Sequence, residues 1–213
     1  MKKHILVLCA IVLTALPLCA AGPADQALQL LKEGNARYLT KTNHAERREA
    51  TAPGQKPFAA VLACADSRVP VEVIFDHGIG DLFVVRVAGN IGCDSAVMGS
   101  LEYAAEHLHV PLIVILGHSN CGAVKAAVDN APVSGHIADI KYAIHPVVCR
   151  TRLAHPGLEG DALLRKVIED NTLQAEADLL AQSRELCQLY KDHKLKIIRA
   201  VYDLASGRVE WLE

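Results

Sequence analysis

The sequence predicts an α/β fold with a mainly parallel β-sheet flanked by helices and an antiparallel edge strand at the carboxyl end. Two apolar runs, residues 58–63 and 111–116, have the length and the branched side chains typical of strands that are buried on both faces. Expected helices alternate with these strands, which predicts crossover connections and parallel pairing. Periodicity alone does not distinguish such a run from a buried helix segment, so the prediction depends on the alternation.

The amino-terminal part is predicted to hold one helix and a surface connection ahead of the core. Asp25 can cap a helix. Its apolar residues recur at roughly helical spacing, and they are Leu28, Leu31, Tyr38 and Leu39. That apolar face is compatible with packing on its own subunit or on a neighbouring one. Residues 41–55 are polar and contain a Pro-Gly pair, so we interpret them as a surface connection that leads to the core at residue 56.

From residue 56 the expected elements are, in order, a strand at 58–63, a short helix after Pro70, a strand at 82–87, a helix at about 94–107, a strand at 111–116, a helix from Gly122, helices at roughly 136–149 and 160–191, and strands at 196–202 and 208–211. The second long helix is predicted to break near Ser183. The last two strands are joined through Ser206-Gly207, which predicts a hairpin and therefore the antiparallel edge strand.

Length and composition predict one domain. A chain of 213 residues with 51% hydrophobic residues can bury one full core. We expect the α/β domain at residues 56–213, preceded by the amino-terminal helix and connection at residues 22–55. The formal net charge is -2 and the sequence contains no block of like charge. Neither nucleic acid nor an anionic membrane is therefore an expected partner.

Residues 1–21 resemble a bacterial secretory signal peptide. Met1-Lys-Lys-His4 is basic, residues 5–18 are apolar apart from two positions, and Cys19-Ala-Ala21 offers small residues for cleavage. A membrane anchor is the alternative, but a spanning helix needs about 20 apolar residues. The sequence therefore predicts a periplasmic or secreted bacterial protein with no stable membrane association after cleavage.

Five cysteines would remain after that cleavage: Cys64, Cys93, Cys121, Cys149 and Cys187. An odd number argues against a simple disulfide framework in an oxidising compartment. A bridge between Cys149 and Cys187 stays open as an alternative. We favour the interpretation that Cys93, Cys149 and Cys187 are small buried hydrophobes.

Two short strings at strand ends carry side chains that can bind a metal ion. Cys64-Ala-Asp-Ser-Arg68 follows the first predicted strand, and His118-Ser-Asn-Cys121 follows the third. The carboxyl ends of neighbouring parallel strands converge in the crevice where open α/β sheets bind ligands. Zn²⁺ prefers cysteine sulfur and histidine nitrogen, so Cys64, His118 and Cys121 are predicted ligands. Asp66 is a candidate for the fourth position.

Asp66 and Arg68 stand two residues apart in a segment predicted to be extended or turning. At this spacing they can form a bidentate ion pair, which would fix the carboxylate and keep it ionised. The alternative is that these two residues form an ordinary loop salt bridge and that Cys64 is a buried thiol.

Together with the residues around them, these strings resemble the β-class carbonic anhydrases. The matching segments are Cys64–Pro70, Asp81–Asn90, Leu116–Val124 and Ala200–Val209. The resemblance implies reversible hydration of CO₂ to bicarbonate and a proton, on zinc held by Cys64, His118 and Cys121. It also implies catalytic roles for Asp66 and Arg68, in which Asp66 either pairs with Arg68 or moves onto the metal and closes the site. Family members associate as dimers or larger assemblies, so a homodimer or homotetramer is expected.

Gly89 and Gly122 are candidates for the substrate pocket. Because glycine has no side chain, these residues would let the backbone approach the metal closely, although turn glycines explain them equally well. Two alternatives to CO₂ hydration also stay open. One is hydrolysis of a CO₂ analogue, COS or CS₂, on the same fold, and the other is a non-enzymatic periplasmic zinc-binding protein.

Overall fold

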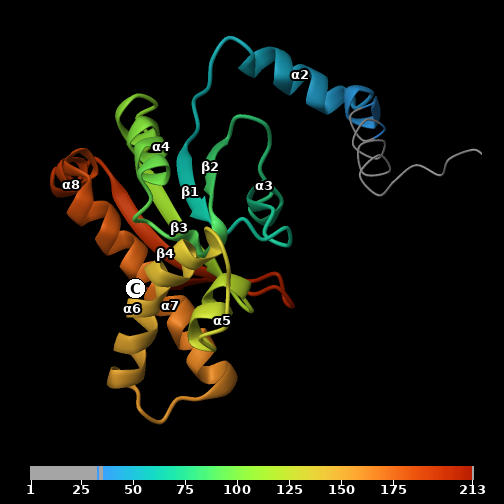
Figure 1. The fold of residues 1–213 in the computed structure, drawn as a ribbon. Coiled ribbons are helices and arrows are strands. Elements are labelled where there is room, and N and C mark those ends of the chain that lie inside the picture. The colour runs from blue at the N-terminus through green and yellow to red at the C-terminus, as the bar shows by residue number, and fades with distance from the viewer. Residues whose placement is uncertain (1–32, 34–35, 213) are drawn as a thin grey trace, which may run out of the picture. The chain divides into compact units, whose positions relative to one another are not determined.

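The computed structural model describes residue 33 and residues 36–212 of the chain (Figure 1). The chain divides into two compact units, residues 1–45 and 46–213. The predicted signal peptide, residues 1–21, lies outside the described residues. Of the helix predicted from Asp25, only residues 33 and 36–39 are described, and they are helical. No helix in the described part of the chain combines the length and the apolar character needed to cross a membrane.

The second unit is built on one five-stranded sheet in the order β2-β1-β3-β4-β5. Its strands are β1 (Ala59–Ala63), β2 (Leu82–Arg86), β3 (Leu112–His118), β4 (Lys196–Tyr202) and β5 (Val209–Leu212). The pairs β1–β2, β1–β3 and β3–β4 are parallel, whereas β4 and β5 are antiparallel. This arrangement confirms the predicted fold class, including the antiparallel edge strand at the carboxyl end.

The helices after the first strand follow the predicted order. They are α3 (Val71–Ile74), α4 (Ser95–Glu106), α5 (Gly122–Val128), α6 (Ile137–Ala154), α7 (Gly160–Gln182) and α8 (Arg184–Lys191), with a short 3₁₀ turn, η1 (Ala88–Asn90), after β2. Asp94 caps α4, because its carboxylate accepts hydrogen bonds from two backbone N–H groups of the first turn. Ser183 separates α7 from α8 and caps α8 through a hydrogen bond from the Leu186 N–H. The predicted break near Ser183 is thereby confirmed.

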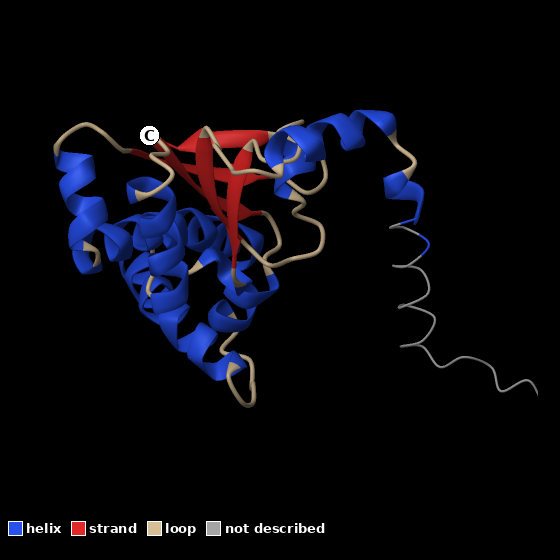
Figure 2. Cartoon of the chain, turned by 90° about the horizontal axis from the view of Figure 1, so that it is seen from above, coloured by secondary structure: helices blue, strands red, loops and turns tan. Residues whose placement is uncertain are grey.

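The long helices gather on one face of the sheet (Figure 2). On that face, alternate residues of the strands pack with Leu101 of α4 and Leu179 of α7 in a buried core. The opposite face forms a second cluster, to which α3 is the only helix that contributes within the described residues. Several apolar residues on this second face remain half-buried, among them Leu82, Val84 and Leu112. Because only the four-residue helix α3 contributes to it among the described residues, this face has less helical cover than the other.

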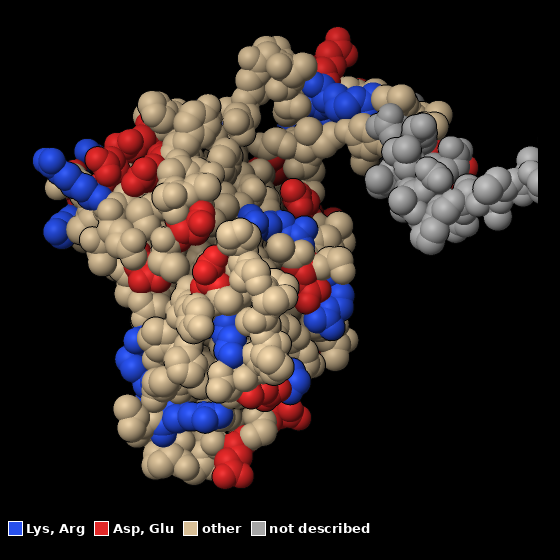
Figure 3. All heavy atoms as spheres, in the orientation of Figure 1, with Lys and Arg blue, Asp and Glu red and all other residues tan. Residues whose placement is uncertain are grey.

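Charged side chains are mixed over the surface rather than gathered by sign. On the face drawn in Figure 3, basic and acidic groups of the described residues are interspersed. Some form ion pairs one helical turn apart, such as Lys125–Asp129 at the end of α5 and Lys166–Asp170 on α7. Ion pairs at the surface contribute little to stability, because water and salt screen them.

The predicted surface connection at residues 41–55 is wrong over most of its length. Helix α2 (Thr42–Thr51) occupies this interval. The Pro-Gly pair on which the prediction depended lies after the helix, at residues 53–54, and not inside it. The segment contains Ala, Glu and Arg, which favour helices, but it has no apolar stripe. Periodicity therefore gave no sign of the helix.

The prediction that Cys93, Cys149 and Cys187 are buried hydrophobes is also wrong. Cys93 and Cys149 are exposed, Cys187 is half-buried, and all three are free thiols, so the alternative bridge between Cys149 and Cys187 is absent. Along α6 the inward positions are taken by Val147 and Val148. The next residue, Cys149, therefore faces solvent.

The loop that follows η1 lies directly against α7. A Cβ atom added at Gly92 would lie 2.6 Å from the carbonyl oxygen of Ala175 and 3.0 Å from its Cα. Real Cβ atoms do not approach backbone this closely, so only glycine lets the loop reach α7. This contact places η1 beside the middle of α7.

We expect Gly92→Ala to lower the free energy of unfolding by about 1–3 kcal/mol, because the added methyl group overpacks the contact with α7. Gly99→Ala is the matched control: Gly99 is exposed in the middle of α4, and a Cβ there meets nothing within 4 Å. That substitution should stabilise the protein by about 0.5–1 kcal/mol. Urea unfolding followed by circular dichroism measures both changes, and a Gly92→Ala protein as stable as the parent would contradict the proposed contact.

Candidate metal centre

Three side chains that can bind a metal meet at the carboxyl ends of β1 and β3. The two strands pair in parallel, and their last paired residues are Ala63 and Leu116. Cys64 follows β1 directly, and His118 is the last residue of β3. Cys121 stands at the N-cap of α5, three residues further on. The sheet register thus brings together residues that are more than fifty positions apart in the chain.

Asn120 turns the chain between His118 and Cys121. Its φ is 53°, in the left-handed region that asparagine adopts more readily than most residues. After this turn, Cys121 returns toward β1. Its sulfur lies 3.9 Å from that of Cys64.

The geometry of the three residues fits a zinc ion. Cys64, His118 and Cys121 are all buried, and their ligand atoms lie within 4.8 Å of one another. Tetrahedral zinc, with Zn–S bonds of about 2.3 Å, would separate two sulfurs by about 3.8 Å, which agrees with the observed 3.9 Å. The Nδ1–H of His118 donates to the Ser119 carbonyl oxygen, 2.9 Å away. Nε2 is thereby left as the ring nitrogen that can bind a metal, and this buried atom has no hydrogen-bond partner among the described residues.

The two sulfurs differ in how readily they ionise. The hydrogen bond from Cys121 lowers the pKa of Cys64, and contacts from His118 and the Gly89 N–H act in the same direction. The same hydrogen bond and burial together raise the pKa of Cys121. The pair alone therefore favours one negative charge. A divalent cation would supply the compensation that a second buried thiolate needs.

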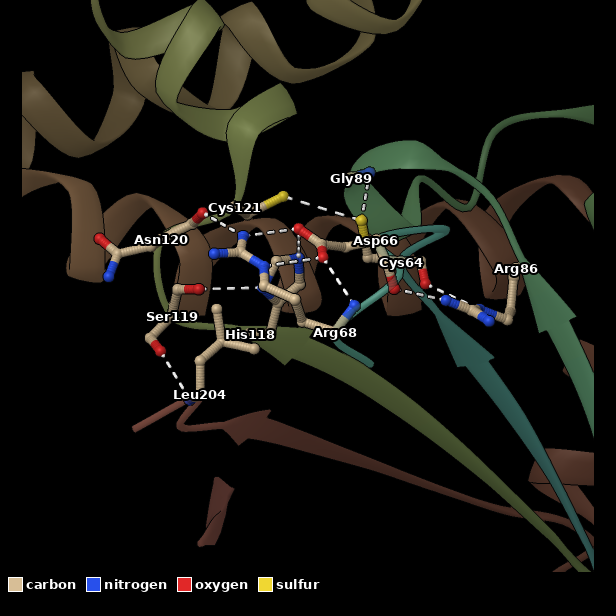
Figure 4. Close-up of polar contacts among 10 residues, drawn as sticks. All are labelled: Cys64, Asp66, Arg68, Arg86, Gly89, His118, Ser119, Asn120, Cys121 and Leu204. Atoms are coloured by element: carbon tan, nitrogen blue, oxygen red, sulfur yellow. Dashed lines mark hydrogen bonds and ion pairs between the residues drawn. The ribbon is translucent and has the colours of Figure 1, made fainter. Parts of the chain in front are cut away.

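Asp66 and Arg68 form the predicted bidentate pair beside these ligands (Figure 4). Asp66 Oδ1 accepts from Arg68 Nε at 2.9 Å and from the Arg68 backbone N–H at 3.0 Å. Asp66 Oδ2 accepts from Arg68 Nη2 at 2.7 Å and lies 3.9 Å from His118 Nε2. The Arg68 guanidinium holds the pKa of Asp66 well below its usual range, so the carboxylate stays ionised. It thus lies at the edge of the metal position while bound to Arg68.

Arg86, at the end of β2, braces the segment that carries Cys64 and Asp66. Its Nε donates to the Cys64 carbonyl oxygen at 3.0 Å, and its Nη2 donates to the Asp66 carbonyl oxygen at 2.5 Å. Sequence reasoning missed this residue. A signal was available, because Arg86 is the one charged residue of an otherwise apolar strand.

Ser119 ties the other ligand segment to the far end of the chain, and it was also missed. Its backbone N–H donates to the Tyr202 carbonyl oxygen at 2.9 Å. Its hydroxyl oxygen accepts from the Leu204 N–H, also at 2.9 Å (Figure 4). The turn after His118 is therefore held by residues at and just beyond the end of β4.

The two glycines singled out from the sequence differ in what they contact. The Gly89 N–H donates to the Cys64 sulfur at 3.3 Å, and the residue has a φ of 73°. A Cβ there would lie 2.8 Å from Ile144 Cδ1. At Gly122, which is exposed, a Cβ would meet nothing within 4 Å. Gly89 thus contacts a predicted metal ligand. At Gly122, close packing gives no reason why the residue should be glycine. The substrate-binding role of both glycines stays a prediction.

Comparison with known proteins gives one consistent result. The family described as carbonic anhydrase matches residues 59–209. Carbonic anhydrase 2 of Mycobacterium tuberculosis is 39% identical over 191 residues, which cover 85% of this chain and 89% of that protein. The carbonic anhydrase of Mycolicibacterium smegmatis is 40% identical over 193 residues, covering 86% and 91%.

Solved structures agree with this result. The β-carbonic anhydrase CafA of Aspergillus fumigatus superposes with a TM-score of 0.78 at 27% identity, covering 88% of this chain and 89% of that one. The Coccomyxa β-carbonic anhydrase in complex with acetazolamide gives a TM-score of 0.77 at 27% identity, covering 87% and 86%. The similarity therefore extends over most of each chain.

We expect bound zinc to protect Cys64 and Cys121 from alkylation, because a thiol that coordinates a metal is no longer a free nucleophile. The exposed Cys93 and Cys149 are internal controls, and they should react at the same rate with and without zinc. Mass spectrometry of peptides after timed treatment with iodoacetamide measures each rate. Equal rates for Cys64 and Cys121 in the zinc-loaded and zinc-free proteins would contradict the ligand assignment.

Proposed function

This chain belongs to the β-class carbonic anhydrase family, and on that premise we propose that Cys64, His118 and Cys121 hold the zinc on which it converts CO₂ and water reversibly to bicarbonate and a proton. The observation that carries the proposal is the buried, unpaired Nε2 of His118 beside two sulfurs 3.9 Å apart. Zinc bound there would supply a Lewis acid that makes a coordinated water acidic enough to act as a nucleophile near neutral pH.

The residues around the metal position orient the ligands and the nucleophile. His118 donates Nδ1–H to the Ser119 carbonyl, which fixes the ring so that Nε2 faces the metal. Arg68 occupies three of the acceptor positions of Asp66 and so keeps the carboxylate ionised and oriented. Oδ2 retains a lone pair near the metal position, where it can accept a hydrogen bond and orient the nucleophile toward CO₂.

Arg68 also decides where Asp66 rests. The carboxylate is a possible fourth ligand, and the guanidinium competes with the metal for it. In the structure Asp66 is paired with Arg68. We propose that this paired arrangement is the active one and that movement of Asp66 onto the metal closes the site.

We expect Asp66→Asn to lower the turnover number for CO₂ hydration by about 10²–10⁴-fold, because the amide has the same shape but lacks the negative charge and one acceptor. Zinc content should be unchanged, since the three ligands remain. Asp129→Asn is the matched control, because Asp129 is exposed and, among the described residues, its carboxylate pairs with Lys125 alone. Stopped-flow hydration assays with metal analysis give both quantities. Activity of Asp66→Asn within about twofold of the parent would rule out this role for Asp66.

We also propose that residues 1–21 direct export and are then removed, so that the mature enzyme is periplasmic or secreted. The basic start, the apolar stretch and the small residues at 19–21 support this. Assembly into a homodimer or homotetramer is a further proposal. It is supported by the thinly covered face of the sheet, where Leu82, Val84 and Leu112 are half-buried.

Expression of the full chain in a Gram-negative bacterium tests both proposals. We expect the protein in the periplasmic fraction, with a mass that begins at Gly22 and a light-scattering mass of two or four subunits. A variant that lacks residues 2–21 should remain in the cytoplasm with the same number of subunits. An uncleaved cytoplasmic parent would refute export, and a monomer at micromolar concentration would refute assembly.

A further inference from the structure

The inward face of α7 carries a polar residue where apolar residues surround it. Leu164, Ile168, Ala175 and Leu179 are buried along this face, and Asn171 lies among them with only 3% of its surface exposed. Burying an amide without a hydrogen-bond partner destabilises the folded state, so an asparagine at such a position needs a specific contact. The group that Asn171 contacts therefore indicates what the residue does.

That contact is the backbone carbonyl of Gly89. Asn171 Nδ2 donates to the Gly89 carbonyl oxygen at 2.8 Å, across 82 positions of sequence. Ile144 of α6 and Ala123 of α5 confine the same residue, since an added Cβ would lie 2.8 Å from Ile144 Cδ1 and 3.3 Å from Ala123 Cβ. The close approach of Gly92 to Ala175, one turn further along α7, holds the same loop. The backbone of Gly89 is thus confined by residues of α5, α6 and α7.

Gly89 also contacts a predicted ligand of the metal centre. Its N–H donates to the Cys64 sulfur at 3.3 Å, as Figure 4 shows. An N–H donor directed at a thiolate makes a charge-assisted hydrogen bond and withdraws electron density from the sulfur. Hydrogen bonds of this kind orient a metal ligand and adjust how strongly it donates to the metal.

We infer that Asn171 is a positioning residue of the zinc centre: by holding the Gly89 carbonyl it fixes the backbone on both sides of the Gly89 Cα, so that the Gly89 N–H orients the Cys64 thiolate and limits its electron donation to the metal. This inference rests on the proposed zinc ligation by Cys64. Asn171 acts through the backbone of one residue, Gly89, and not through a ligand side chain. A purely structural role would stabilise α7 without changing the zinc–sulfur bond.

Zinc affinity and the spectrum of the cobalt-substituted protein test the inference. Asn171→Leu keeps a similar shape but has no donor, and Asn171→Asp keeps the shape as an acceptor only. We expect each variant to bind zinc about 10–100-fold more weakly in competition with a chromophoric chelator. Because the sulfur regains electron density, the thiolate-to-cobalt charge-transfer band should move to lower energy. Two variants are used so that one remains available if the other fails to fold.

Thr172→Val is the matched control. Thr172 is fully buried next to Asn171, and its hydroxyl donates to the Glu169 carbonyl within α7. Its zinc affinity should stay within about twofold of the parent, with an unshifted band. The inference is overturned if the Asn171 variants keep the parent's affinity and band, or if Thr172→Val shows the same losses. Neither measurement uses CO₂, so a failure here is distinguishable from a failure of the proposed hydration activity.

Discussion

The parallel pairing of β1 with β3 is the contact on which the metal centre depends. Ala63 and Leu116 are paired in the sheet. Cys64 follows Ala63 directly and His118 lies two residues after Leu116, so both ligands face a common point. Both strands are central and buried on both faces, so a slip of one residue would turn their side chains to the wrong faces. The hydrophobic core therefore fixes the register, and the register fixes the distance between the ligands.

Around these ligands the chain places supports that act through its backbone. Arg86 holds the carbonyl groups on either side of Ala65, Ser119 is tied to Leu204, and Asn171 holds Gly89. Each support comes from a different element, so the site is connected to the sheet, to α7 and to the terminal hairpin. Its geometry is consequently a property of the whole second unit and not of the two strings alone.

This distinction explains which features could be predicted from the sequence. The metal-binding and charged side chains of the site lie at predicted strand ends, and their residue types and spacing were sufficient to predict that they meet. They are Cys64, His118, Cys121 and the Asp66–Arg68 pair. Asn171 and Ser119 contact backbone atoms, and a hydrogen bond to a carbonyl or an N–H leaves no complementary residue type in the sequence. Helix α2 was missed for another reason: it has no apolar stripe, and its helical propensity is the only local signal.

The link between Ser119 and Leu204 also affects how the protein is made. All three proposed ligands have been synthesised by residue 121, but β4 and the backbone N–H of Leu204, which hold the turn after His118, emerge much later. At a rate of about 5–20 residues per second, the ribosome needs roughly 4–17 s to reach them. Until then the turn after His118 lacks its hydrogen bonds to Tyr202 and Leu204, so the carboxyl-terminal hairpin completes the support of this ligand segment.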